Sequence, residues 1–219
     1  MSAADDKLSG LKRLGAQRRA FSVPEGCLPV GAFHGGRYES DFVSPWTISA
    51  CNVDADLFVV LQDWCGSDYL SGPFNPLLAK LGHDPQLPTN RNLKALLYGI
   101  GRDFSDVFGT NAFPFVKSGA MDADIENKAL RECVERFVLP QVDIVQPKVT
   151  VLMGKTVYNA VCKVLGRKAA PSLDAAIATP IAFGSTLLVA SVHTGNRIHI
   201  HRGWDRAVDD WKWIGARLA

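Results

Sequence analysis

Four short apolar runs, each closed by polar or turn-forming residues, are the strongest pattern in the chain. They cover Asp56–Leu61, Val107–Phe113, Val149–Met153 and Thr186–Val192. Continuous apolar runs of this length are typical of strands that are buried on both faces, as in a parallel sheet. The pattern therefore predicts four strands, each followed by a polar loop.

Helical spacing fills the gaps between these runs. Leu93, Leu96, Leu97 and Ile100 lie at i, i+3, i+4 and i+7, which predicts a helix that ends at Gly101. Further apolar stripes predict helices over 125–138 (ending before Pro140), 156–165 and 204–218. Strands that alternate with helices form parallel crossovers, with helices on both faces of the sheet. We expect an α/β fold, a three-layer α/β/α sandwich with a central four-stranded parallel sheet.

The sequence predicts a single domain that is preceded by a short basic segment. Its 219 residues, 47% of them hydrophobic, suit a single compact core. Residues 1–20 are polar and basic, and we expect a solvated helix or a frayed arm, with an arm that contacts nucleic acid as the alternative. Residues 21–54 lack periodicity and are expected to wrap irregularly over the core. The domain prediction is therefore a basic segment, 1–20, and a single domain, 21–219.

Charge and cysteine content limit the class of protein. A net charge of +2 permits nucleic-acid binding without demanding it. The five cysteines are odd in number and contain no C-x-x-C pair, so neither a disulfide framework nor a zinc or iron–sulfur site is expected. The chain has no signal-peptide pattern and no apolar stretch of the roughly 20 residues that span a bilayer. We expect a soluble cytoplasmic protein.

The loops after the predicted strands hold the candidate chemistry, because ligands of open parallel sheets bind beyond the carboxyl ends of the strands. Asp63 follows the first run, where a partly desolvated carboxylate can serve as a base or an electrostatic stabiliser. Its alternative role is to cap the next turn. Asn111 ends the second run and can read an acceptor–donor pair on a planar ligand, or it can stabilise a turn.

The last two loops add basic residues. Gly154-Lys155 opens a predicted helix and suits a phosphate, although a plain helix start is the better interpretation of this segment taken alone. The segment Ser191–Trp204 carries three histidines, and His199 and His201 alternate as they would on a strand. Without a nearby carboxylate or cysteine partner these histidines make a poor metal site, and no metal is predicted.

Together these segments resemble a known family over about residues 54–215. Leu61–Gly66 reads LQDWCG and resembles the G-Q-D-P-Y-H motif that follows a buried strand in the efficient uracil-excising branch of the uracil-DNA glycosylase superfamily. Thr110-Asn111 matches the base-reading asparagine of that branch, and Val192–Arg197 stands where its H-P-S-P loop would be. The segments GPF at 72–74, with Leu77-Leu78, and PTNRNL at 88–93 are similar to segments of its iron–sulfur branch. The cluster cysteines of that branch are missing, as are the Pro and Ser of the histidine loop.

The resemblance implies a DNA glycosylase that hydrolyses the N-glycosidic bond of uracil, or of another deaminated base, and leaves an abasic site for base excision repair. It assigns catalysis to Asp63 and His193, with no cofactor, in a monomer that acts on DNA. The base would be bound by four residues, with Phe74 stacking on its ring: Gln62, Cys65, Phe74 and Asn111. Contacts to DNA would come from Gly154, Lys155, Arg197, Ile198 and Arg202, with Arg197 as the wedge.

The sequence departs from the family motif at Cys65, and it leaves two alternative functions open. Cys65 stands where the efficient branch has a tyrosine that blocks the methyl group of thymine, so a more open pocket is expected. A non-catalytic nucleotide- or nucleic-acid-binding α/β module would also place polar residues at strand ends. A metal-dependent hydrolase that uses His193, His199 and His201 is a second alternative.

Overall fold

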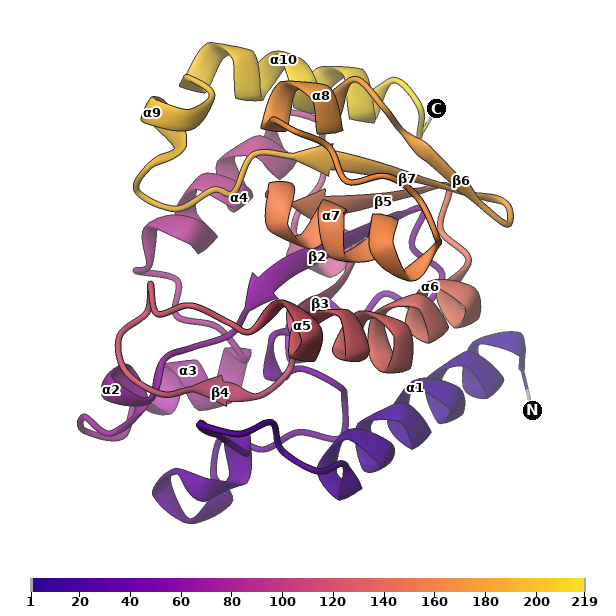
Figure 1. The fold of residues 1–219 in the computed structure, drawn as a ribbon. Helices are drawn as coiled ribbons and strands as arrows, with labels where there is room; N and C mark the ends of the chain where they lie inside the picture. Colours follow the sequence, from indigo (N-terminus) through magenta and orange to yellow (C-terminus); the bar gives the residue numbers. More distant parts are fainter. Residues whose placement is uncertain (1, 219) are drawn as a thin grey trace.

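A mostly parallel sheet forms the middle layer of the molecule, with helices on both of its faces (Figure 1). The computed structural model describes residues 2–218. The strand order is β3-β2-β5-β7-β6, in which the first four strands are parallel and β6 is antiparallel to β7. The strands are β2 (Leu57–Asp63), β3 (Phe108–Phe113), β5 (Val149–Met153), β6 (Ile181–Phe183) and β7 (Thr186–Ser191). The α/β sandwich is therefore confirmed.

The sheet has five strands where the sequence predicts four. The additional strand, β6, is only three residues long and forms a hairpin with β7, in which Phe183 pairs with Thr186. Gly184 occupies the tight turn with φ 55°, a conformation that glycine adopts without strain. Three residues are too few for a period or a run to stand out, so the sequence pattern misses this edge strand.

Three strands of the sheet, β2, β5 and β7, contribute to two cores. Phe58 and Val60 face one cluster of buried residues, and Leu57, Val59 and Leu61 face the other, as the two-residue period of a strand requires. The first cluster is covered by α1 (Ala3–Ala20), α5 (Asn127–Cys133), α6 (Leu139–Val145), α7 (Lys155–Val164) and α8 (Leu173–Ile177). The second is covered by α2 (Ser67–Leu70), α3 (Pro76–Leu81), α4 (Pro88–Tyr98), α9 (Ile198–His201) and α10 (Trp204–Gly215).

The helix predicted over 125–138 does not end before Pro140. It continues from α5 through a π-helical segment, Val134–Val138, into α6. The backbone N–H of Leu139 donates to the carbonyl of Val134, one residue further back than in an α-helix. Such π-helical turns let a helix absorb a local disturbance, here a proline that has no N–H to donate.

Helix α1 contains nearly all of the basic segment and packs against the domain. Leu11 and Leu14 are buried in the first core, and α1 contacts α6. Arg18 is 1% exposed and forms two hydrogen bonds to the carboxylate of Glu39, at 2.9 and 2.5 Å. The charge of Arg18 is therefore paired with that of Glu39 inside the protein.

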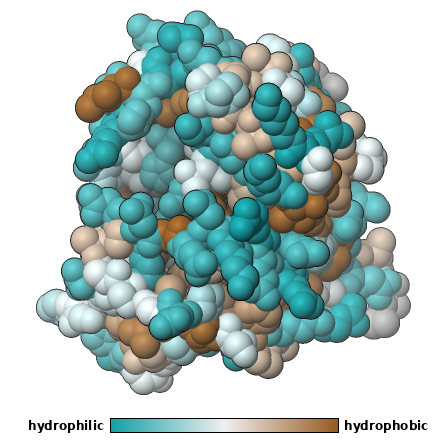
Figure 2. All heavy atoms as spheres, in the orientation of Figure 1, coloured by the Kyte–Doolittle hydropathy of each residue, from teal (hydrophilic) through white to brown (hydrophobic). Residues whose placement is uncertain are grey.

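The carboxyl ends of the parallel strands meet at one edge of the sheet. Leu61 pairs with Asn111, Asp63 with Phe113, and Met153 with Ser191. β1 (Cys27–Leu28) and β4 (Val116–Lys117) form a second, small antiparallel sheet, and Lys117 of β4 bridges to Gly66 just after β2. Hydrophilic residues cover most of the face seen in Figure 2, with hydrophobic ones scattered among them. Between residues 2 and 218, none of the helices combines the length and apolarity needed to cross a bilayer.

Candidate active site

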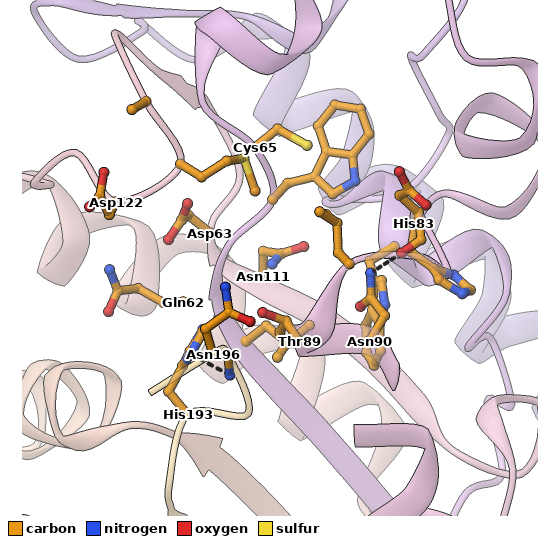
Figure 3. Close-up of a pocket in the computed structure, with 18 of the residues that line it drawn as sticks. Gln62, Asp63, Cys65, His83, Thr89, Asn90, Asn111, Asp122, His193 and Asn196 are labelled. Carbon is orange, nitrogen blue, oxygen red and sulfur yellow. Dashed lines mark hydrogen bonds between the residues drawn. The ribbon is translucent and has the colours of Figure 1, made fainter. Parts of the chain in front are cut away.

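A cavity of about 850 Å³ lies at the carboxyl edge of the sheet (Figure 3). Residues from successive strand ends line it: Gln62, Asp63 and Cys65 after β2, Asn111 on β3, Thr156 on α7 and His193 after β7. The cavity lies within the range of pockets that enclose small ligands. The structure thus brings together both predicted catalytic residues and three of the four predicted base-binding residues.

The carboxylate of Asp63 is held by a lysine that the sequence analysis did not single out. The Nζ of Lys117 lies 2.8 Å from Oδ2 of Asp63, and the two side chains are 4% and 11% exposed. Lys117 also donates to the backbone carbonyl of Met121 at 2.6 Å. The other oxygen of Asp63, Oδ1, has no hydrogen-bond partner within residues 2–218, so it is available to a ligand in the cavity.

The ring of His193 has a defined hydrogen-bonding pattern. The backbone N–H of Gly195 donates to its Nδ1 at 3.1 Å, so the neutral ring carries its proton on Nε2. His193 is exposed at the mouth of the cavity, and partial desolvation of its ring by the surrounding protein lowers its pKa below the ordinary value of 6.5, while the nearby charge of Asp63 acts in the opposite direction. His193 is therefore a neutral Nε2–H donor at the edge of the cavity.

The loop that carries His193 is tied to α4 on the neighbouring side of the cavity. Thr194 is fully buried, and its hydroxyl donates to the carbonyl of Thr89 at 2.9 Å. The side-chain amide of Asn92 donates to the carbonyl of Thr194 at 2.8 Å. Residues of the PTNRNL segment thus position the histidine loop, a role that the sequence alone did not reveal.

Asn111 and Cys65 occupy the inner wall of the cavity. Asn111 is 1% exposed, and its Oδ1 accepts a hydrogen bond of 2.5 Å from the hydroxyl of Ser44. Cys65 is also 1% exposed, and burial, with the charges of Asp63 and Asp84 acting in the same direction, raises the pKa of its thiol well above the usual value. Cys65 is therefore a protonated thiol and serves as a small wall residue.

Phe74 is not among the residues that line the cavity. The guanidinium of Arg37 lies 3.7 Å from the centre of its ring, and the ring of Tyr38 packs beside it. The prediction that Phe74 stacks on a bound base is therefore not supported by this arrangement. Trp46 and Trp64 supply aromatic surface to the cavity instead, and the indole of Trp64 donates to the carbonyl of Gly82 at 2.7 Å.

Of the residues predicted to contact DNA, some are exposed, and others are buried or already paired within the protein. Arg197 is exposed and lines the cavity. Ile198 is fully buried, which rules it out as a surface contact, whereas Ile200 two residues later is 79% exposed. Arg202 is 10% exposed in its side chain and forms ion pairs with Asp210 at 2.7 Å and Asp174 at 2.5 Å, so its charge is already neutralised.

The strand-like alternation of His199 and His201 is also misleading. Both residues lie in the short helix α9, and His199 packs near Trp204, while His201 reaches the cavity wall. Searching residues 2–218 gives no group of three or more His, Cys, Asp or Glu side chains placed to hold a metal ion.

Gly154 and Lys155 lie at the start of α7, next to the histidine loop. Gly154 has φ 98°, and a Cβ atom there would lie 3.6 Å from Cβ of His193. Lys155 is exposed, and its Nζ lies 3.4 Å from the carbonyl oxygen of Pro171. The backbone of Gly154 is thus beside the cavity, while the charge of Lys155 is directed along the surface.

Comparison with known proteins identifies the family of the chain. A family model described as the uracil DNA glycosylase superfamily matches residues 67–211, about two thirds of the chain. No curated protein matches the sequence significantly. The matched segment includes Asn111 and His193 and begins just after Asp63. The chain belongs to the uracil-DNA glycosylase superfamily.

Proposed function

We propose that the protein removes uracil, or a closely related deaminated base, from DNA by hydrolysing its N-glycosidic bond. Membership of the superfamily supports a DNA glycosylase type of function in general. The observation that carries the more specific proposal is that one cavity is lined by the carboxylate of Asp63, the Nε2–H donor of His193 and the side-chain amide of Asn111. The product would be an abasic site, the starting point of base excision repair.

The reaction begins when the damaged nucleotide leaves the base stack. Rotation of a nucleotide out of a duplex costs on the order of a few kcal/mol, which contacts to the backbone and the base must offset. Arg197 lines the cavity, and the exposed side chain of Ile200 lies three residues further along, in helix α9. We assign the wedge to this Arg197–Ile200 segment, and the backbone of Gly154 to an approach by phosphate.

Cleavage of the bond builds positive charge on the sugar and negative charge on the departing base. Asp63, which is kept in place by Lys117, would stabilise the sugar cation and position the attacking water through Oδ1. His193 would donate its Nε2–H to the O2 atom of the base and stabilise the leaving anion. The lowered pKa of His193 favours the neutral ring, and neutral imidazole is sufficient for this donation.

The inner wall would recognise the base. Asn111 pairs with the base edge, while Gln62 and Cys65 complete the wall around it. Asp84, Asp122 and Asp124 also line the cavity. We therefore expect the phosphates of bound DNA to stay near Arg197 and the start of α7, away from this acidic side.

The experiment is incubation with a uracil-containing oligonucleotide, followed by alkali to break the strand at abasic sites. We expect cleavage with the wild-type protein and at least a roughly hundredfold lower single-turnover rate for Asp63→Asn and for His193→Ala. Addition of EDTA should leave the rate unchanged, and a loss of activity in EDTA would favour the metal-dependent alternative. Binding of the oligonucleotide without any strand break would indicate a non-catalytic binding module and would refute the proposal.

A further inference from the structure

We propose that Ser44 is a specificity-determining residue, because it fixes the amide of Asn111 so that a donor faces the bound base. The inference rests on the proposed glycosylase function and adds a positioning residue to the same site. Ser44 would help this site to select bases that present a carbonyl oxygen where the undamaged base carries an amine.

Ser44 links two hydrogen bonds, because its hydroxyl accepts one and donates the other. The backbone N–H of Trp46 donates to Oγ of Ser44 at 3.2 Å, and the Ser44 hydroxyl donates to Oδ1 of Asn111 at 2.5 Å. Ser44 is fully buried, and within residues 2–218 its hydroxyl has no acceptor other than Asn111. If the amide were turned over, two N–H groups would face Ser44 and its hydroxyl proton would be left unpaired. Buried unpaired donors are costly, so the observed orientation is strongly preferred.

The fixed orientation decides which atom of Asn111 is free. Since Oδ1 faces Ser44, the Nδ2 amino group is the free end of the amide, and it has no hydrogen-bond partner in the described part of the chain. Asn111 itself lines the cavity. Oδ1 retains a second lone pair, because a carbonyl oxygen can accept two hydrogen bonds. The amide therefore offers a donor, and beside it an acceptor, to the edge of a planar base.

This pattern matches the chemical change caused by deamination. Loss of the amine converts the donor at one position of cytosine, adenine or guanine into a carbonyl oxygen, and places an N–H on the neighbouring ring nitrogen. The carbonyl accepts from Nδ2 and the ring N–H donates to Oδ1. An undamaged base would place its amine against Nδ2, so that donors face each other. Because the cavity is large and Cys65 is small, polarity rather than size would make this distinction.

Ser44 is rigidly held. It begins the 3-10 helix Pro45–Ile48, whose Thr47 donates from its hydroxyl to the carbonyl of Gly109 on β3 at 2.6 Å. The indole of Trp46 packs directly on Gly109, where a Cβ atom would lie 1.8 Å from Cζ3 of the ring. The same helix thus forms two buried hydroxyl contacts to β3, and only the one from Ser44 reaches the amide of Asn111.

These two hydroxyl groups provide a matched pair of variants, Ser44→Ala and Thr47→Val. Single-turnover rates would be measured on oligonucleotides that contain uracil, 4-thiouracil or cytosine, with thermal melting of each variant as a check on folding. In 4-thiouracil a weakly accepting sulfur replaces O4, so the uracil-to-4-thiouracil rate ratio reports the contact with Nδ2.

We expect Ser44→Ala to lower this ratio by about tenfold, which is typical for one hydrogen bond of this kind, and to raise cytosine excision relative to uracil. Thr47→Val should leave the ratio unchanged, even if it lowers the melting temperature. An unchanged ratio in Ser44→Ala, or an equal change in Thr47→Val, would overturn the inference while uracil excision by the wild type still supported the proposed function. If the wild-type protein excises no uracil, the proposed function itself fails.

Discussion

Lys117 and Asp63 form an ion pair of 2.8 Å in which neither side chain is more than 11% exposed. Removal of one partner from such a pair leaves an uncompensated buried charge, which typically costs about 3–5 kcal/mol of folding free energy. When both charges are removed the penalty is much smaller. We therefore expect substitutions at these two positions to have strongly non-additive effects on the free energy of unfolding.

Lys117→Met should lower the free energy of unfolding by about 3 kcal/mol, and the double variant Asp63→Asn/Lys117→Met should recover part of that loss. Urea unfolding of the wild type, both single variants and the double variant measures the coupling. Lys212→Met is the control, because the Lys212–Asp209 pair is mostly exposed, and it should change stability little. Additive single-variant effects would contradict a coupled pair.

The lowered pKa of His193 gives a prediction for the pH dependence of excision. Protonation of the ring would place a proton on Nδ1, where the N–H of Gly195 already points. We expect the activity to decline at acidic pH with a midpoint below 6.5, because the pKa of His193 is lowered from that value. Between this lowered pKa and 6.5 the unfolded chain binds more protons at this residue, so stability should decrease as the pH falls.

The pH–rate profile of single-turnover excision, measured for the wild type and for the residual activity of His193→Ala, tests this assignment. The acidic decline should be reduced or absent in the variant. A midpoint above 6.5 in the wild type, or an identical decline in both proteins, would assign the titration to another group.

Gly195 leaves little room for a side chain beside His193. A Cβ atom there would lie 3.0 Å from Nδ1 and 3.1 Å from Cε1 of His193, closer than ordinary contact. Gly195→Ala should therefore displace the ring and lower the excision rate by about tenfold or more, while the melting temperature changes little. Gly31→Ala is the control, because its nearest neighbour would be the Glu39 carboxylate at 3.4 Å, and it should retain wild-type activity.

The small side chain of Cys65 predicts the breadth of specificity. A tyrosine at this buried position would occupy part of the cavity wall, so Cys65→Tyr should lose excision of 5-substituted uracils and xanthine while it retains more of the activity on uracil. Cys65→Ala should keep the broad range. A panel of lesion-containing oligonucleotides measures both variants, and a wild-type protein that acts on uracil alone would contradict the prediction.

The sequence predicts the buried parts of the fold well because burial dictates a pattern. Leu57–Leu61 of β2 is apolar throughout, β5 is apolar apart from Thr150, and the predicted strand Val149–Met153 is the observed one. The spacing of residues fails to predict secondary structure where a segment is very short. His199 and His201 are two positions apart, and one such interval fits a strand as well as the helical turn that the structure has.

The candidate site was only partly predictable for a different reason. Asp63, Asn111 and His193 stand directly after or within apolar runs, so their convergence follows from the topology of the sheet. Ser44 and Lys117 act through side chains that are distant in sequence from the residues they orient, and no local period marks such partners. For Phe74 a short motif matched, but its ring packs against Arg37 and Tyr38 and does not line the cavity, so its stacking on a base stays a prediction.

The short strand β1 places part of the support for the proposed active site well outside the segment shared with the family. Cys27 of β1 pairs with Lys117, and Lys117 holds Asp63, so residues near position 27 support the proposed catalytic carboxylate through one strand pair and one ion pair. Ser44 and Asp63 also precede residue 67, where the family match begins. A fragment cut to the matched boundaries would keep His193 and Lys117, but it would lose the carboxylate of Asp63, the strand that pairs with Lys117 and the hydroxyl of Ser44 that orients Asn111.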